Sequence, residues 1–268
     1  MNTAKAIREL TNEQLIERAP SVGAIEPFSS TSNIYSFVPT TNAVDYLRDA
    51  GWLPVDVKET NARSGKLGFQ KHMIRFARPD LDWGERRPEL LLQNSHDGAS
   101  SFQLDAGVFR FICSNGMVVM DGYGLHYKHR HVGFTPDLFV QNAQEIALGV
   151  EAVGNVLENW ESIELTPNEQ GIYAMAAHQL LYEEHEKAPI KAERLLVDRR
   201  KEDRQPDLWH TFNRVQENVI KGGLPGWNQN NRRTRTRAIK SIDRDKKLNQ
   251  ALWTLTEEMA KLKQPCNN

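Results

Sequence analysis

The stretch TPDLFVQNAQEIALGVEAVGNVLENW, residues 135–160, decides the fold class, because the hydrophobic period changes there. Thr135 and Pro136 are typical of a helix start, since a capping side chain precedes a proline in the first turn. Apolar residues then recur every three or four positions, at Ile146, Val150, Val153, Leu157 and Trp160. This spacing predicts a long amphipathic helix.

Three further helices are predicted after this stretch. Thr166, Pro167 and Glu169 form a capping box with proline at the first helical position, which opens a helix that continues to residue 180. A second helix is expected over residues 208–219, ended by the glycine pair that follows it, and a third over residues 248–262. The C-terminal half is therefore predicted to be helical.

The N-terminal half is predicted to hold a sheet. Strands are expected at residues 34–38, 52–57, 67–77 and 89–93, with a helix that begins at Thr40 or Thr41 and ends at Gly51. Residues 101–120 fit a strand or a helical face equally well. The predicted class is α+β, with a sheet-bearing N-terminal half packed with a helical C-terminal half. The predicted division is a peripheral segment 1–33, a sheet region 34–133, and a helical region 134–264 that contains a basic loop, 221–247.

Composition excludes several classes of protein. The 268 residues are 39% hydrophobic and 26% charged, as in an ordinary globular chain. The two cysteines, Cys113 and Cys266, cannot build a disulfide framework. Residues 1–20 mix charged and apolar side chains and lack the apolar centre of a secretory signal, so we expect a cytoplasmic protein with no membrane partner.

The basic residues are concentrated in one segment. The whole chain has a formal charge of −1, yet residues 221–247 hold nine Lys and Arg against two Asp. Within them, LPGWNQNNRRTRTR (224–237) is expected to be a mobile loop with an indole beside four arginines. Arginine pairs with phosphate in two-point geometry, and an indole can stack on an unpaired base. The predicted nucleic-acid-binding residues are Trp227, Arg232, Arg233, Arg235, Arg237, Lys240, Arg244 and Lys247.

Two features qualify this interpretation of the basic segment. Lys240, Arg244 and Lys247 follow one another at spacings of four and three, so we expect them to extend the basic surface along one face of the final helix. The alternative is a solvated loop whose charges form scattered ion pairs. Few acidic residues lie nearby in the sequence, which favours an anionic partner.

The histidine cluster is a candidate metal site that we do not favour. His129 and His131 alternate, so on a strand both would face one ion, with His126 close by. Lys128 and Arg130 oppose a cation, so we predict no metal and expect a surface ribbon that contacts phosphate. His178, Tyr182 and His185 share one face of a predicted helix, but no nucleophile accompanies them.

No catalytic motif is complete. Ser95, His96 and Asp97 are neighbours, and adjacent side chains point apart, so we expect a polar turn rather than a hydrolytic triad. Asp80 and Glu89 lack the following Glu-x-Lys of a nuclease pattern, and no phosphate-binding glycine loop is present. We therefore predict no catalytic residue, no cofactor and no enzymatic activity.

Several strings resemble a known family. They are QNSHDG (93–98), GVFRFICSNG (107–116), DLWHTFNRVQENVIKGGL (207–224), RTRAIKSI (235–242) and LNQALW (248–253). They are similar to the domain-of-unknown-function 932 family, which is carried by plasmids and prophages. The resemblance extends over residues 34–262 and does not depend on the histidine cluster. It implies a bacterial cytoplasmic protein of a mobile element, and no assigned activity.

Two hypotheses of different class follow, and a third ranks below them. The first is a non-enzymatic DNA-binding protein, with single strands favoured, that acts in conjugative entry or phage recombination. The second is an anti-defence protein whose basic segment docks on an acidic face of a host immune protein. The third is a metal-dependent enzyme built on His126, His129 and His131. A homo-oligomer is compatible with each.

Overall fold

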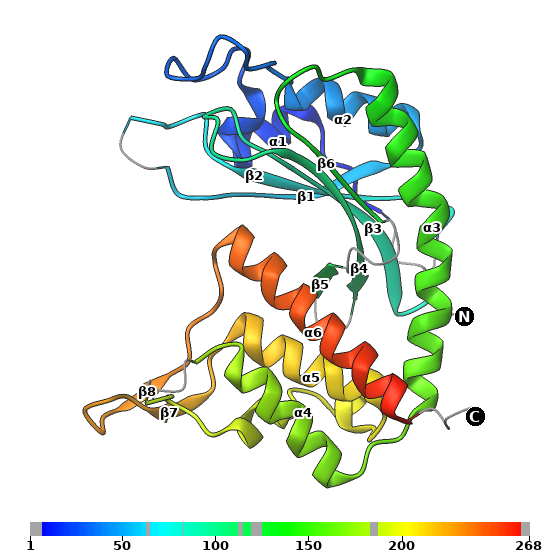
Figure 1. Ribbon diagram of the computed structural model, residues 1–268, viewed down its shortest axis with the longest axis vertical. Helices are drawn as coiled ribbons and strands as arrows, with labels where there is room; N and C mark the ends of the chain where they lie inside the picture. Colours follow the sequence, from blue (N-terminus) through cyan, green and yellow to red (C-terminus); the bar gives the residue numbers. More distant parts are fainter. Residues whose placement is uncertain are drawn as a thin grey trace. The chain divides into compact units, whose positions relative to one another are not determined.

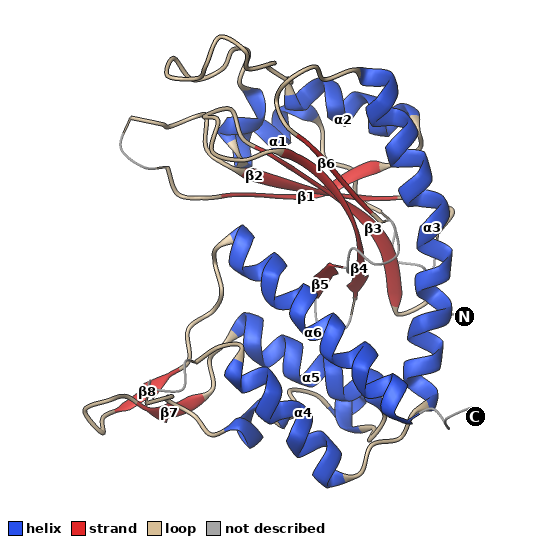
Figure 2. Ribbon diagram, in the orientation of Figure 1, coloured by secondary structure: helices blue, strands red, loops and turns tan. Residues whose placement is uncertain are grey.

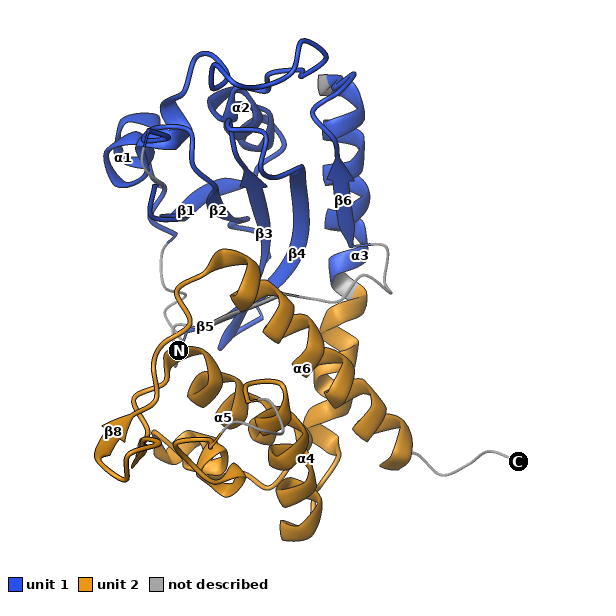
Figure 3. Cartoon of the chain, turned by 60° about the vertical axis from the view of Figure 1, so that its left-hand side comes forward, with its two compact units in different colours: residues 1–151 blue, residues 152–268 orange. Residues whose placement is uncertain are grey.

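The computed structural model describes residues 7–62, 65–81, 83–111, 115–118, 125–182 and 187–263. The chain forms two compact units, residues 1–151 and 152–268 (Figure 3). The six-stranded sheet lies in the first unit and helices fill most of the second, which confirms the α+β class (Figure 2). The units divide within helix α3 (Pro136–Ser162), later in the chain than the predicted boundary at residue 133.

The first unit begins with α1 (Asn12–Arg18), the 3-10 helix η1 (Pro20–Gly23) and α2 (Thr40–Asp49). Leu15 and Val22 are fully buried, as are most of the apolar side chains around them. The prediction of a peripheral segment over residues 1–33 is therefore wrong for residues 10–22. A few apolar side chains at helical spacing are enough to dock a short capped helix, even between charged neighbours. Residues 1–6 lie outside the described range.

The strands of the sheet are β1 (Leu53–Glu59), β2 (His72–Ala77), β3 (Arg86–Asn94), β4 (Phe102–Arg110), β5 (Asn115–Val118) and β6 (His126–His129). They pair antiparallel in the order β1-β2-β3-β4, and β5 and β6 pair with different parts of β4. The ambiguous region 101–120 thus contains a strand at 102–110. The strand predicted at 34–38 is wrong: residues 35–39 have no regular structure and lead through Pro39 into α2.

The two faces of the sheet differ in chemistry. Residues directly opposite one another in an antiparallel pair share a face, so Ile74, Leu92 and Leu104 lie on one apolar face. Phe139 of α3 packs edge-on against Phe102 on this face, with ring centroids 5.2 Å apart. Figure 1 shows α2 and the first turns of α3 alongside the sheet in the first unit. The opposite face carries charged side chains and is described below.

The second unit contains the C-terminal part of α3 and α4 (Pro167–Gln179), η3 (Ala192–Leu196), η4 (Lys201–Arg204), α5 (Leu208–Lys221), β7 (Pro225–Trp227), β8 (Arg233–Arg235) and α6 (Ile242–Lys263). The capping box of Thr166 and Glu169 is present, which confirms the predicted start of α4. The core is aromatic: Trp160 lies 4.6 Å from Trp253, and both are buried. Among the described residues, no helix offers an apolar stretch able to cross a membrane.

Candidate nucleic-acid interface

The basic segment folds as a β-hairpin. Strands β7 and β8 pair Pro225 with Arg235, Gly226 with Thr234 and Trp227 with Arg233. The expectation of a mobile loop over residues 224–237 is therefore wrong. Because alternate residues point to opposite sides of a strand, one face of the ribbon carries Pro225, Trp227, Arg233 and Arg235, and the other carries Gly226 and Thr234. Figure 1 shows the hairpin extending away from α4, α5 and α6.

Gly226 fixes the inner face of the hairpin against the rest of the second unit. The amide of Trp227 donates a hydrogen bond of 2.8 Å to the carbonyl of Pro189. A Cβ atom on Gly226 would lie 2.0 Å from the same carbonyl oxygen, so a larger residue cannot occupy this position without displacing the ribbon. The close approach explains why a residue without a side chain lies in the middle of β7.

Further hydrogen bonds order both ends of the hairpin. At its base, the Gly223 amide donates to the Thr236 carbonyl at 2.8 Å, and the Thr236 amide donates to the Leu224 carbonyl at 2.9 Å. At its tip, the Asn228 side chain accepts hydrogen bonds from the amides of Asn230 and Arg232. Asn231 adopts a left-handed backbone with a φ of 54°, which asparagine tolerates better than most residues. The asparagines of this segment therefore build a turn.

The arginines of the hairpin are exposed and have no acidic partner in the part of the chain that the structure describes. Within the described parts of the chain, no carboxylate forms an ion pair with Arg232, Arg233, Arg235 or Arg237. The Arg233 guanidinium lies over the Trp227 ring, 5.9 Å from its centroid, and Trp227 is 53% exposed. The alternative considered from the sequence, a loop whose charges form scattered ion pairs, therefore does not apply to these four arginines within the described chain. Contacts with Trp227 and with the Gly223 carbonyl position Arg233 and Arg235, respectively, and leave their charge available to a ligand.

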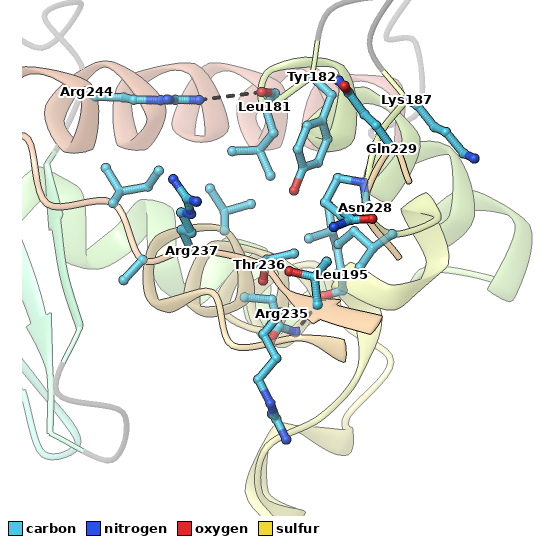
Figure 4. Close-up of a pocket in the computed structure, with 17 residues that line it drawn as sticks. Leu181, Tyr182, Lys187, Leu195, Asn228, Gln229, Arg235, Thr236, Arg237 and Arg244 are labelled. Carbon is cyan, nitrogen blue, oxygen red and sulfur yellow. Dashed lines mark hydrogen bonds between the residues drawn. The ribbon is translucent and has the colours of Figure 1, made fainter. Parts of the chain in front are cut away.

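The remaining three predicted cations separate from one another. Lys240 lies before the first residue of α6, so it does not continue a helix face as expected. Arg244 and Lys247 are exposed on the first turns of α6, and Arg244 donates to the carbonyl of Leu181 at 3.5 Å. Arg244 thus lines a cavity of about 470 Å³ together with Arg235 and Arg237 (Figure 4). The structure brings part of the predicted set together and leaves Lys240 and Lys247 outside this cavity.

A second cavity, of about 890 Å³, adjoins the tryptophan. Its lining includes Trp227 and Arg233 from the hairpin, and Lys187, Lys191 and Arg194 from the segment before and within η3. Glu193 is the one acidic side chain among the residues described there. We call this cavity the tryptophan groove. Its second wall was missed from the sequence because residues 187–194 are about forty positions away from the hairpin and show no distinctive spacing.

The family model described as a domain of unknown function (DUF932) matches residues 27–253. The chain belongs to the DUF932 family. It is 36% identical to the UPF0380 protein YafZ of Escherichia coli strain K12, over 96% of this chain and 94% of that protein. It has the same identity and coverage with the UPF0380 protein YfjQ of the same strain. No solved structure matches the chain. DUF932 membership confirms the resemblance seen in the sequence, and its name assigns no activity.

The three histidines of the predicted cluster in this DUF932 chain, His126, His129 and His131, differ in their surroundings. His126 Nδ1 lies 2.5 Å from an oxygen of Asp105, a residue that the sheet register places directly opposite it. His129 packs near Tyr127 and Phe134, and His131 is buried with its ring 4.6 Å from that of Tyr35. The expected surface ribbon is wrong for His131. No group of three potential metal ligands occurs among the described residues, and the prediction that no metal binds stays a prediction.

The remaining candidate residues from the sequence analysis are the two cysteines, the histidine and tyrosine residues near α4, and the polar turn after β3. His185, Cys113 and Cys266 lie outside the described range. Helix α4 ends at Gln179, so Tyr182 is not on the helix face predicted for it together with His178. The residues after Asn94, the last residue of β3, form a bend that leads to β4, as expected of a polar turn, and the side chains of Asn94, Ser95 and His96 are fully buried.

That buried turn belongs to a polar network beneath α2. The Thr40 hydroxyl lies 2.8 Å from His72 Nε2 and 3.1 Å from His96 Nε2, and it accepts a hydrogen bond from the Asn94 amide. His72 Nδ1 lies 2.9 Å from Ser21 Oγ, which donates to Glu59. Burial lowers the pKa of His72 to about 4. Burial, together with His72 and His131 nearby, lowers the pKa of His96 to about 3.

A charged cluster lies on the opposite face of the same sheet. Arg75 donates to both oxygens of Glu89, at 2.6 and 2.9 Å, and Arg87 donates to one of them at 2.7 Å. The Arg75 guanidinium also lies over the ring of Phe109, 4.0 Å from its centroid. Glu89 was considered above as part of an incomplete nuclease pattern. Its carboxylate is occupied by two arginines, which is the geometry of a buried ion pair.

Proposed function

We propose that this protein binds single-stranded nucleic acid, with DNA as the favoured form, through the outer face of the β7–β8 hairpin and the tryptophan groove. In the setting that the sequence resemblance implies, it would act on strands of a plasmid or prophage during entry or recombination. The proposal is non-enzymatic. It requires only that the arginines of the hairpin bind phosphates and that the indole of Trp227 stacks on an unpaired base.

One observation carries the proposal: the pairing register places an exposed indole and two unpaired guanidiniums on the same face of an ordered ribbon. Trp227 offers a stacking surface that every base can use. Arg233 and Arg235 offer forked donors for phosphate oxygens, and the Arg235 guanidinium also donates to the Gly223 carbonyl, which orients it. The outer face of the ribbon thus combines one aromatic side chain with two cationic ones.

The residues of the tryptophan groove extend this surface. Lys187, Lys191 and Arg194 place three more cations around the apolar wall made by Pro189 and Ile190. Unpaired bases are flat and largely apolar on their faces, whereas the strand backbone is anionic. A groove whose lining combines apolar and cationic side chains suits both parts of a single strand. Paired bases in a duplex do not expose their faces, so a duplex gains only the charged contacts.

The test is the salt dependence of binding to a fluorescent oligonucleotide. If about four phosphates are contacted, the slope of log affinity against log salt is expected near −3 for a single strand, because released counterions drive binding. The double variant Arg233→Ala/Arg235→Ala is expected to flatten the slope by about 1.4. A matched control is Arg8→Ala/Arg18→Ala, which removes two exposed arginines from the N-terminal unit, one before α1 and one at its end.

Trp227→Ala distinguishes stacking from charge. It is expected to weaken single-strand binding by about 1–3 kcal/mol and to leave the salt slope unchanged, because stacking releases few ions. Equal flattening by the control pair, or no salt-sensitive binding by the wild-type protein, overturns the proposal. In that second outcome, the basic hairpin is better explained as a docking surface for an acidic host protein, as the anti-defence hypothesis holds.

A further inference from the structure

The cavity of about 470 Å³ in Figure 4 shares Lys187, Pro189, Ile190 and Thr234 with the tryptophan groove, and the two spaces differ in their other lining residues. Trp227 and Arg233 line only the groove, and Arg237 and Arg244 line only this cavity. The hairpin strand β8 contributes Thr234 to both, so the ribbon forms a wall between them. We call the cavity of about 470 Å³ the arginine cavity. Its contents are not needed for the proposed contacts along the outer face of the hairpin.

The arginine cavity holds two guanidiniums without an acidic partner. Among residues that the structure describes, no carboxylate pairs with Arg237 or Arg244. Arg244 uses one N–H for the Leu181 carbonyl, which leaves further donors of its guanidinium unused by that bond. Figure 4 shows Arg237 pointing toward the side of the cavity where Arg244 lies, and Arg235 pointing away. Two cations that converge with no counter-charge among the described residues indicate a site for an anion.

The rest of the lining is suited to an amphipathic anion. Leu195, Val219 and Ile239 supply apolar surface, and Asn228 and Thr236 supply amide and hydroxyl groups. The Tyr182 ring lines the cavity, with its hydroxyl directed inward in Figure 4. It also contacts His178, with ring centroids 4.8 Å apart, which limits its movement. An aromatic ring at one side and two guanidiniums at another match a base and a phosphate.

We propose that the arginine cavity binds a nucleoside monophosphate, with the phosphate on Arg237 and Arg244 and the base against Tyr182. The volume lies within the range of small-ligand sites and admits a single nucleotide. The same chemistry has two sources, a free nucleotide or the phosphorylated end of a strand. The strand-end form rests on the proposed function, because the hairpin would hold the adjoining nucleotides, whereas the free-nucleotide form does not.

Calorimetric titration of the full chain tests the ligand class. We expect dAMP to bind with one site per chain, and both deoxyadenosine and inorganic phosphate to bind at least about tenfold more weakly. Arg237→Ala and Arg244→Ala should each weaken dAMP binding at least about tenfold, because each removes charge-assisted hydrogen bonds. Arg18→Ala is the matched control, since this exposed arginine lies at the end of α1 and lines neither cavity. The inference is overturned if dAMP binding is undetectable and a terminal phosphate does not increase the affinity for an oligonucleotide.

Oligonucleotides with and without a 5′ or 3′ phosphate distinguish the two sources. Tighter binding of a phosphorylated end, lost in Arg237→Ala and retained in Trp227→Ala, supports recognition of a strand end. Binding of dAMP without any oligonucleotide binding supports a free-nucleotide site and overturns the proposed function alone. A third outcome is that the protein does not bind dAMP, and that its oligonucleotide binding depends on Trp227 but not on a terminal phosphate. This outcome supports the proposed function and overturns this inference.

Discussion

The polar groups of the sheet unit and those of the hairpin are chemically alike but differ in whether the protein itself supplies their partners. Beneath α2, Thr40 contacts two histidines and an asparagine, and on the other face of the sheet Glu89 binds two arginines. In the hairpin, Arg232 and Arg233 have no acidic partner among the described residues. The comparison teaches that polar groups with internal partners serve stability, and exposed groups without them are available for binding.

The strongest test of this comparison is Glu89→Ala. Removal of the carboxylate leaves Arg87 buried without its counter-charge and leaves Arg75 only its longer ion pair with Asp56, at 3.4 Å. The free energy of unfolding should therefore fall by about 3–5 kcal/mol. Urea unfolding followed by circular dichroism measures the change. Glu9→Ala is the control, because the side chain of Glu9 is 43% exposed in its pair with Arg48 and should contribute about 1 kcal/mol at most. Equal effects of the two variants would contradict the comparison.

The next effect in size is expected from Thr40→Val. The variant keeps the branched shape and removes the hydroxyl that contacts His72, His96 and Asn94, so buried polar atoms lose a partner. The free energy of unfolding should fall by about 1–3 kcal/mol. Thr41→Val, one residue along α2, changes the same chemistry outside this network and should have little effect. A loss below that of the control would show that the network is not a source of stability.

Acid should weaken the network through its histidines. The folded protein holds the pKa values of His72 and His96 near 4 and 3, below the ordinary value of 6.5, so the unfolded chain takes up protons first as the pH falls. Stability is therefore fully present above pH 6.5 and should decline below it, by up to about 1.4 kcal/mol per pH unit for each histidine. Urea unfolding at intervals from pH 7.5 to 5 measures the decline. A flat profile for the wild type, or an equal decline in His72→Gln, would contradict this assignment.

The smallest effects on stability are expected in the hairpin. Arg232→Ala and Arg233→Ala should each change the free energy of unfolding by less than about 0.5 kcal/mol, because both side chains are exposed and lack ion pairs within the described chain. The same urea series measures this. Arg233→Ala should nevertheless weaken oligonucleotide binding. If Arg233→Ala lowered both stability and binding, Arg233 would be a structural residue, and its loss of binding would not show a direct contact with the ligand.

The parts of the fold that depend on local pattern were predictable. The helical period after Thr135 and the capping box at Thr166 correspond to α3 and α4, and the glycine pair after residue 221 ends α5. Those signals act over a few residues and need no knowledge of distant neighbours. The segment before α2 failed because its residues resemble a strand in composition while Pro39 directs the chain into a helix.

The sequence located the basic residues of the candidate site but did not reveal their geometry. The density of arginine identified residues 232–237, but the hairpin lacks the alternating apolar residues that reveal a strand, because its outer face carries cations. Its anchor, Pro189, and the cations near it are distant in sequence. The contact of His126 with Asp105 likewise arises from the register of β4 and β6, which no spacing within either strand discloses.

The close fit of Gly226 against Pro189, with the asparagine-built turn at the tip, has a thermodynamic consequence. A disordered segment of the same length would lose about 1–2 kcal/mol of backbone conformational entropy for each residue that a ligand orders. The hairpin loses this entropy when the protein folds. A partner therefore binds a surface whose backbone is already ordered. Association should therefore proceed with little rearrangement of the backbone, and a modest number of contacts can yield a useful affinity.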